Sequence, residues 1–190
     1  GNHNVENALA AISVCISFKI NKSIIKNSLE TFHGVKRRLT KIYDNNEIIF
    51  FDDYAHHPTE IRETLKALKS KSGRLISVIQ PHRYSRLNEN YGNFIKSLRD
   101  ADVSIILPIF SAGEIKIKGI NSLNLTKDIN KKKYTKAYYA SNFLKAKNKL
   151  NQILKPKDTV VFMGAGSISS WCNDYCLLYT SPSPRDTIRS

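Results

Sequence analysis

The stretch IIFFDDYAHHPTEIRETLKAL, residues 48–68, contains the pattern that decides the fold. Its first four residues form a short apolar run, which is typical of a β-strand that is buried on both faces. Two aspartates end the run. Pro58 then suits the first turn of a helix, because the N–H that proline lacks has no intrahelical partner there. Ile61, Leu65 and Leu68 recur at helical spacing, so the stretch predicts a strand followed by a helix.

Four further apolar runs of strand length follow, and segments with helical spacing separate them. The predicted strands are 75–79, 103–107, 137–140 and 159–163. A strand over 39–43, joined to residues 48–51 by a turn of one Asp and two Asn, is expected to open the sheet as a hairpin. Ser141 is expected to cap the helix before the last strand. We predict a Rossmann-like, doubly wound α/β fold, in which helices cover both faces of a mostly parallel sheet.

The two ends of the chain depart from this alternation. Residues 4–18 and 23–32 carry apolar residues at helical spacing, and Gly34 is a stop signal. We expect residues 1–34 to be helices that end a preceding domain, and residues 35–171 to form the α/β domain. The segment 172–190 has no periodicity and contains two Ser-Pro pairs, so we expect a disordered tail that is not native to the protein.

The composition and charge of the chain limit the kinds of partner that it is expected to bind. The chain has 190 residues and a formal net charge of +14, which could suit nucleic acid or a membrane surface. The lysines are instead spread over several predicted helices, and residues 131–133 are their only run of three. The chain contains no apolar run of membrane-spanning length. We therefore expect neither nucleic acid nor a membrane as a partner, and three cysteines without a pairing pattern favour a cytoplasmic location.

Polar and ionisable residues gather where the predicted parallel strands end. Four such groups follow four of the strands. The first strand is followed by Asp52, Asp53, Tyr54, His56 and His57, and the next by Gln80, His82, Arg83, Tyr84 and Arg86. The third is followed by Ser111, Gly113 and Glu114, and the last by Gly164, Gly166 and Ser167. Ligands of open α/β sheets bind beyond the carboxyl ends of the strands. Because guanidinium groups pair with carboxylates and phosphates, the two arginines of the second group predict an anionic ligand at this edge.

Simpler interpretations of these residues stay open. The adjacent histidines could lie in a loop without function, the aspartates could cap the next helix, and the arginines could form a solvated helix face. A metal site that combined the histidines with Asp52 is less favoured, because adjacent loop residues usually point apart. The glycines at 164 and 166 lack the third glycine of a dinucleotide fingerprint, since position 169 is serine. No phosphate-binding loop of the Gly-x-x-x-x-Gly-Lys-Ser/Thr type occurs.

Several longer motifs, taken together and in order, resemble those of the Mur ligase family. GNHNVENALAA at 1–11 is similar to the end of the central ATPase domain of these enzymes, and GVKRRL at 34–39 to the junction with their C-terminal domain. The match continues over DDYAHHPTEI at 52–61, QPHRYSR at 80–86, SAGE at 111–114 and MGAGSI at 163–168. These motifs resemble most closely the branch of the family that uses L-alanine, with the murein tripeptide ligases as the alternative.

The resemblance implies an ATP-dependent carboxylate–amine ligase of peptidoglycan synthesis. Such an enzyme joins L-alanine to UDP-N-acetylmuramate through an acyl phosphate, with Mg²⁺ held mainly by the central domain. Residue by residue, it implies nucleotide contacts for Asn4, Arg38 and Asp53, and contacts with alanine and the reacting carboxylate for Tyr54, His56, Arg83 and Arg86. It assigns no certain catalytic residue and no metal ligand. Because the phosphate loop and the UDP-binding domain are missing, we predict that this chain alone does not turn over ATP.

Two other classes of function stay open at this point. The chain could be a nucleotide- or anion-binding α/β module without catalysis, or a basic domain that binds nucleic acid. The second alternative predicts tight binding to DNA or RNA with a steep salt dependence.

Overall fold

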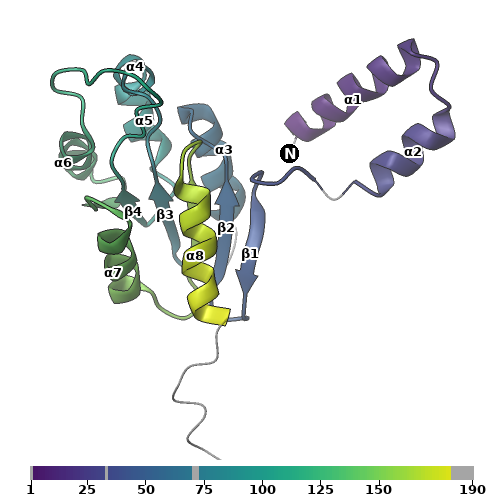
Figure 1. Cartoon of the computed structure of the whole chain (residues 1–190). Helices are drawn as coiled ribbons and strands as arrows, with labels where there is room; N and C mark the ends of the chain where they lie inside the picture. Colours follow the sequence, from purple (N-terminus) through teal and green to yellow (C-terminus); the bar gives the residue numbers. More distant parts are fainter. Residues whose placement is uncertain (1, 33, 70–72, 181–190) are drawn as a thin grey trace, which may run out of the picture. The chain divides into compact units, whose positions relative to one another are not determined.

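The computed structural model describes residues 2–32, 34–69 and 73–180 (Figure 1). The chain divides into two compact units, Gly1–Lys36 and Arg37–Ser190, which we describe separately. The division falls close to the boundary expected after residue 34.

The first unit consists of two helices, α1 (Asn2–Ser17) and α2 (Lys22–Glu30), close to the predicted ranges. The side chain of Asn21 caps α2 by accepting a hydrogen bond from the N–H of Ser23 (2.9 Å). Large apolar side chains of this unit are exposed, and Phe18 is 77% exposed. No described residue of α2 is buried, so these helices lack an apolar core of their own.

The second unit contains one six-stranded sheet. Its strands are β1 (Thr40–Asp44), β2 (Ile49–Asp53), β3 (Leu75–Ile79), β4 (Val103–Ile106), β5 (Lys136–Tyr139) and β6 (Thr159–Met163). The order across the sheet is β1-β2-β6-β3-β4-β5, with β1 antiparallel to β2 and every other pair parallel. The predicted opening hairpin and mostly parallel sheet are therefore confirmed. The last strand in the sequence lies in the middle of the sheet, between β2 and β3.

Two apolar cores lie on opposite faces of this sheet, because successive side chains of a strand point to opposite faces. In β2, Phe51 enters one core and Phe50 the other, and in β6 Val161 and Val160 divide in the same way. The first core includes side chains of α3 (Pro58–Lys69), α5 (Tyr91–Ser97) and α6 (Ser122–Lys132). The second includes side chains of α7 (Phe143–Ile153) and α8 (Ile168–Thr180), and Figure 1 shows α8 lying across its face of the sheet. Helices cover both faces, as predicted.

Two details of the helices differ from prediction. The segment between β3 and β4, expected to be helical, contains two helices, because a separate short helix, α4 (Tyr84–Glu89), precedes α5 and meets it at Asn90. The cap of α7 is Asn142 rather than Ser141, since the Asn142 side chain accepts a hydrogen bond from the N–H of Lys145 (2.9 Å). The helix therefore starts one residue later than expected, at Phe143.

The prediction that residues 172–190 form a disordered tail is wrong for 172–180, which are part of α8. Cys172, Tyr175 and Cys176 are buried against the sheet together with Ile168. Their spacing of four, seven and eight residues from Ile168 is that of one helix face. This helical signal was missed because the Ser-Pro pairs further along the chain favour an irregular segment. The rest of the predicted tail, 181–190, lies outside the described residues.

Candidate functional site

The loops that leave the parallel strands meet at one edge of the sheet. They are residues 54–57 after β2, 80–83 after β3, 107–121 after β4 and 164–167 after β6. Backbone bonds join them in pairs: the N–H of Gln80 donates to Met163 (3.0 Å), and the N–H of Arg83 donates to Phe110 (2.8 Å). The candidate residues that follow different strands are therefore held at one edge.

A row of four aromatic rings crosses this edge. The ring of Tyr54 lies 5.1 Å from that of His56, which lies 5.5 Å from that of His82. The His82 ring stacks on Phe110, with centroids 5.5 Å apart and planes within 12°. Consequently, three separate loops contribute to one continuous surface, and Phe110 belongs to it although its sequence context did not mark it as a site residue.

The guanidinium of Arg86 joins this row. Its Nη1 lies 3.3 Å from Nδ1 of His82, and because arginine can only donate, this imidazole nitrogen accepts. Burial lowers the pKa of His82, and the positive charges of His56, Arg86 and Arg83 lower it further. This contact uses one of the five N–H donors of Arg86, so the guanidinium has further donors with which to bind an anion.

Arg83 occupies a strained position beside this row. It has a φ of 67° directly before the first residue of α4, a left-handed conformation that is uncommon for a residue with a side chain. Strained backbone of this kind costs about 1–3 kcal/mol and persists only when its surroundings enforce it. The side chain of Arg83 is exposed, so the backbone presents its charge to solvent at the edge.

Glu60 organises the loop that carries the paired histidines. Its carboxylate accepts hydrogen bonds from the N–H groups of His56 (3.1 Å) and His57 (3.2 Å), and lies 4.0 Å from the guanidinium of Arg38. Burial raises the pKa of Glu60, but these N–H groups and the charges of His56 and Arg38 outweigh burial, so the pKa falls below its usual value. The signal that could have revealed this role is a Glu in the first turn of α3, three residues after His57.

Asp53 has an internal role. Its carboxylate accepts hydrogen bonds from the N–H groups of Leu39 (2.8 Å) and Ala55 (2.7 Å). Burial raises the pKa of Asp53, although both hydrogen bonds and the charge of Arg38 oppose the rise. The carboxylate thereby holds the turn that presents the exposed Arg38, whose guanidinium lies 5.7 Å from the Tyr54 ring centroid. A direct nucleotide contact of Asp53 stays a prediction.

Arg37 and Asp52 form a buried link that sequence reasoning missed. Nη2 of Arg37 donates to the carbonyl of Gly164 (2.7 Å), and its Nε lies 3.8 Å from the carboxylate of Asp52. The guanidinium also lies over the ring of Tyr54, 4.9 Å from the centroid. Asp52 further accepts a hydrogen bond from the hydroxyl of Ser169 in α8. The link thus ties together the ends of β2 and β6, which are distant in sequence.

Of the seven predicted site residues, the structure brings Tyr54, His56 and Arg86 into the ring row and its immediate contacts. Arg83 and Arg38 border the row, while Asp53 lies beneath it. The side chain of Asn4 lies outside the described part of the chain.

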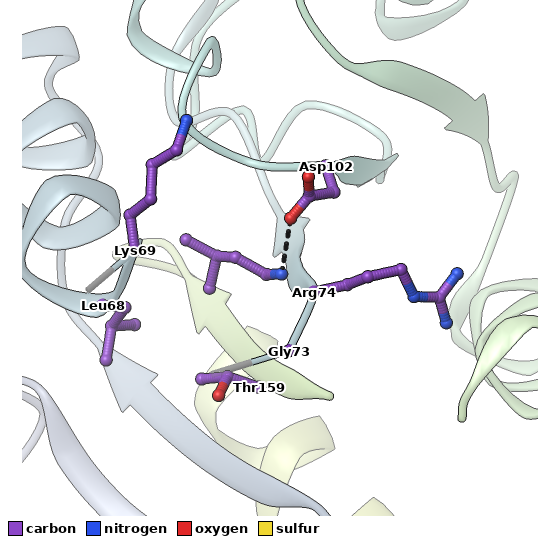
Figure 2. Close-up of a pocket in the computed structure, with 7 residues that line it drawn as sticks. Leu68, Lys69, Gly73, Arg74, Asp102 and Thr159 are labelled. Atoms are coloured by element: carbon purple, nitrogen blue, oxygen red, sulfur yellow. Dashed lines mark hydrogen bonds between the residues drawn. The ribbon is translucent and has the colours of Figure 1, made fainter. Parts of the chain in front are cut away.

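One cavity among the described residues lies away from the ring row. Figure 2 shows this hollow of about 150 Å³, which is lined by Leu68, Lys69, Gly73, Arg74, Leu75, Asp102 and Thr159. Leu75 and Thr159 begin β3 and β6, so the cavity lies at the opposite edge from the ring row. Asp102 accepts a hydrogen bond from the N–H of Leu75 (2.8 Å), and Arg74 is held by Asp158 (2.6 Å) outside the hollow. These charged groups serve the fold.

Among the described residues, no helix has the length and apolar character that a membrane span requires. No three or more His, Cys, Asp or Glu side chains among them are grouped so that they could hold a metal ion.

Comparisons with known proteins agree with this arrangement. The family described as Mur ligase, glutamate ligase domain, matches residues 37–166. A UDP-N-acetylmuramate–L-alanine ligase of Sulfurihydrogenibium sp. is 43% identical over 172 residues, which are 89% of this chain and 37% of the relative. The ligase of the same name from Rickettsia bellii is 41% identical over 182 residues, 92% of this chain and 37% of the relative. The chain thus spans little more than a third of the length of these relatives.

Solved structures show the same similarity. A UDP-N-acetylmuramate–alanine ligase from Thermotoga maritima superposes with a TM-score of 0.73 at 28% identity, covering 96% of this chain and 39% of that one. A murein peptide ligase from Psychrobacter arcticus superposes with a TM-score of 0.70 at 26% identity, covering 93% and 37%. The matched family covers more than half of the chain, including every loop of the ring row. The chain therefore belongs to the Mur ligase family.

Proposed function

We propose that this chain is the C-terminal part of an ATP-dependent ligase that joins L-alanine to UDP-N-acetylmuramate. The proposal is carried by one observation: His56, His82 and Arg86 converge at the carboxyl edge of the sheet, in loops that carry the motifs of the alanine-using branch. The names of the relatives that are 41–43% identical support the same branch.

The proposed role of the arginines is to hold the amino acid. Arg83 and Arg86 are permanently charged, and the α-carboxylate of alanine can accept hydrogen bonds from their guanidinium groups. His82 accepts from one nitrogen of Arg86 and restricts the orientation of that side chain. His56, held by the carbonyl of Tyr54 (2.9 Å) and by Glu60 (3.4 Å), is proposed to orient the substrate rather than to remove a proton.

ATP is proposed to approach the same edge. The exposed guanidinium of Arg38 suits a phosphate, and Asp53 fixes the turn on which it stands. When bound with ATP, Mg²⁺ neutralises charge on the transferring phosphoryl group, and we expect its ligands mainly in the preceding part of the enzyme. The muramate carboxylate takes the γ-phosphoryl group from ATP and ADP leaves; the amine of alanine then attacks the acyl carbon, phosphate leaves, and the amine loses a proton to solvent. This edge would orient the amine and exclude water, which otherwise hydrolyses the acyl phosphate.

The first unit is proposed to be the end of the central ATPase domain. Its exposed apolar side chains, Val5, Leu9 and Phe18 among them, suit helices that pack in a larger core. On this proposal the chain alone lacks the phosphate-binding site and does not turn over ATP.

The test compares the purified 190-residue chain with a chimaera. In the chimaera, the part of the Sulfurihydrogenibium relative that precedes the matched region is joined to this chain. Phosphate release that needs both UDP-N-acetylmuramate and L-alanine is expected from the chimaera and not from the chain alone. Arg83→Ala should lower kcat/KM for alanine by a factor that corresponds to about 1.5–3 kcal/mol of lost transition-state stabilisation, the usual contribution of a hydrogen bond to a charged group. Appreciable turnover by the isolated chain would refute the missing-domain argument.

The murein tripeptide ligases are the second candidate, because the Psychrobacter arcticus enzyme superposes almost as well as the alanine ligase. The same chimaera separates the two functions. If it uses the L-alanyl-γ-D-glutamyl-meso-diaminopimelate tripeptide and not free alanine, the tripeptide function replaces the alanine function.

A further inference from the structure

The loop after β4 sends one carboxylate to the start of α4. Glu114 accepts two hydrogen bonds from Ser85, one from its N–H (3.0 Å) and one from its hydroxyl (2.7 Å). Each carboxylate oxygen accepts one of these bonds, so the contact fixes both the orientation of Ser85 and its distance from Glu114.

This contact replaces a cap that the helix lacks. The residue before α4 is Arg83, whose side chain makes no capping hydrogen bond. The first N–H groups of a helix have no partner within it and need one from outside. Glu114 supplies that partner to Ser85 from 29 residues away in the sequence.

The same loop also holds the other side of Arg83. The N–H of Arg83 donates to the carbonyl of Phe110 (2.8 Å), and the N–H of Phe110 donates to Pro81 (2.8 Å). Residues 110 and 114 therefore fix the backbone on both sides of the left-handed Arg83. Without Glu114, the segment after Arg83 loses the bonds that oppose relaxation of its φ angle.

We propose that Glu114 is a positioning residue for the amino-acid substrate, which acts through Ser85 on Arg83 and Arg86. The inference rests on the proposed function, since it assumes that these arginines hold the carboxylate of alanine. Glu114 itself need not touch the substrate, because its carboxylate is already occupied by Ser85.

The kinetic test uses the chimaera. Glu114→Gln removes the charge and one acceptor oxygen, and is expected to raise KM for alanine about tenfold, equivalent to ~1.4 kcal/mol. The value of kcat and the KM for ATP should stay within about twofold, because misplaced arginines weaken binding of the alanine carboxylate equally in the ground state and the transition state, which raises KM alone. Ser85→Ala should have a similar effect, and the double variant should be far from additive, because both changes break one contact. The matched control is Glu63→Gln, which removes an exposed pair with Arg62 (3.2 Å) and should change neither constant.

A spectroscopic test on the full 190-residue chain does not depend on catalysis. The two bonds from Ser85 hold the pKa of Glu114 below its usual value. The Ser85 amide resonance should therefore shift with a midpoint below that of an ordinary glutamate, and the shift should vanish in Glu114→Gln. The side-chain Nε–H resonances of Arg83 and Arg86 should move in Glu114→Gln and not in Glu63→Gln.

The outcomes separate the two proposals. A chimaera that does not ligate alanine contradicts the proposed function, and the resonances then decide whether Glu114 positions the arginines. A chimaera that ligates alanine with an unchanged alanine KM in Glu114→Gln overturns the role of Glu114 while leaving the function standing. Arginine resonances that stay fixed in Glu114→Gln also overturn it.

Discussion

Individual charged residues at the carboxyl edge act mainly by holding other residues. Glu60 fixes the histidine loop, Asp53 fixes the turn of Arg38, and Arg37 links Asp52 to Gly164. The side chains of Arg38 and Arg83 reach solvent, and buried or half-buried carboxylates hold the backbone from which they extend. The chemistry offered to a ligand therefore depends on residues that do not contact it.

The lowered pKa of Glu60 predicts a pH dependence of stability. A carboxylate whose pKa is lower in the folded state stabilises the fold above its unfolded pKa, and this contribution is lost as the pH falls through the folded value. Glu60→Gln should therefore reduce the free energy of unfolding at pH 7, and the difference from wild type should shrink by pH 3. Urea titrations at both pH values measure this.

Glu63→Gln on the same helix is the control for that experiment, since Glu63 is an exposed residue whose carboxylate pairs with its neighbour Arg62. A difference between wild type and Glu60→Gln that is the same at both pH values would contradict the account.

Sequence reasoning identified the motif-bearing residues of the candidate site, including Asp53 among its supports, but not the long-range contacts that hold them. Arg83 and Arg86 stand out because two arginines follow a strand end. The link from Arg37 to Gly164 spans 127 residues, and no local pattern announces a contact of that range. Phe110 was missed for the same reason, since its stacking on His82 exists only once two loops are brought together.

Among the elements, the strands were the most predictable. Central strands of a parallel sheet are apolar on both faces, so 75–79 and 159–163 were identified with the bounds that the structure gives. The ends of the helices were less predictable. Ser141 and Asn142 are both residue types that cap helices, and nothing in the local sequence pattern distinguishes them.

This choice of cap gives a prediction for α7. Asn142→Ala should lower the free energy of unfolding by about 1 kcal/mol, because the N–H of Lys145 loses its partner. Ser141→Ala should change it by a few tenths at most. Chemical denaturation of both variants measures the difference. Equal effects would mean that the helix does not rely on Asn142.

The two units of the chain differ in how far they bury their own apolar side chains. The α/β unit has two cores of its own, whereas the first unit exposes most of its apolar side chains. Deleting residues 1–36 should therefore leave the unfolding midpoint of the α/β unit in urea nearly unchanged. It should also reduce binding of a hydrophobic dye, because exposed apolar surface is removed. A large fall in the midpoint would show that the α/β unit depends on these helices.

The position of β6 has a consequence for synthesis of the protein. A nascent chain that ends at residue 158 lacks the strand that joins β1-β2 to β3-β4-β5. If the two groups of strands pair before residues 159–163 emerge, β2 and β3 each have an unpaired side, and such strands are prone to pair with other chains. We therefore expect chaperone protection during that interval to matter more for this topology than for one in which the last strand is added at the margin of the sheet.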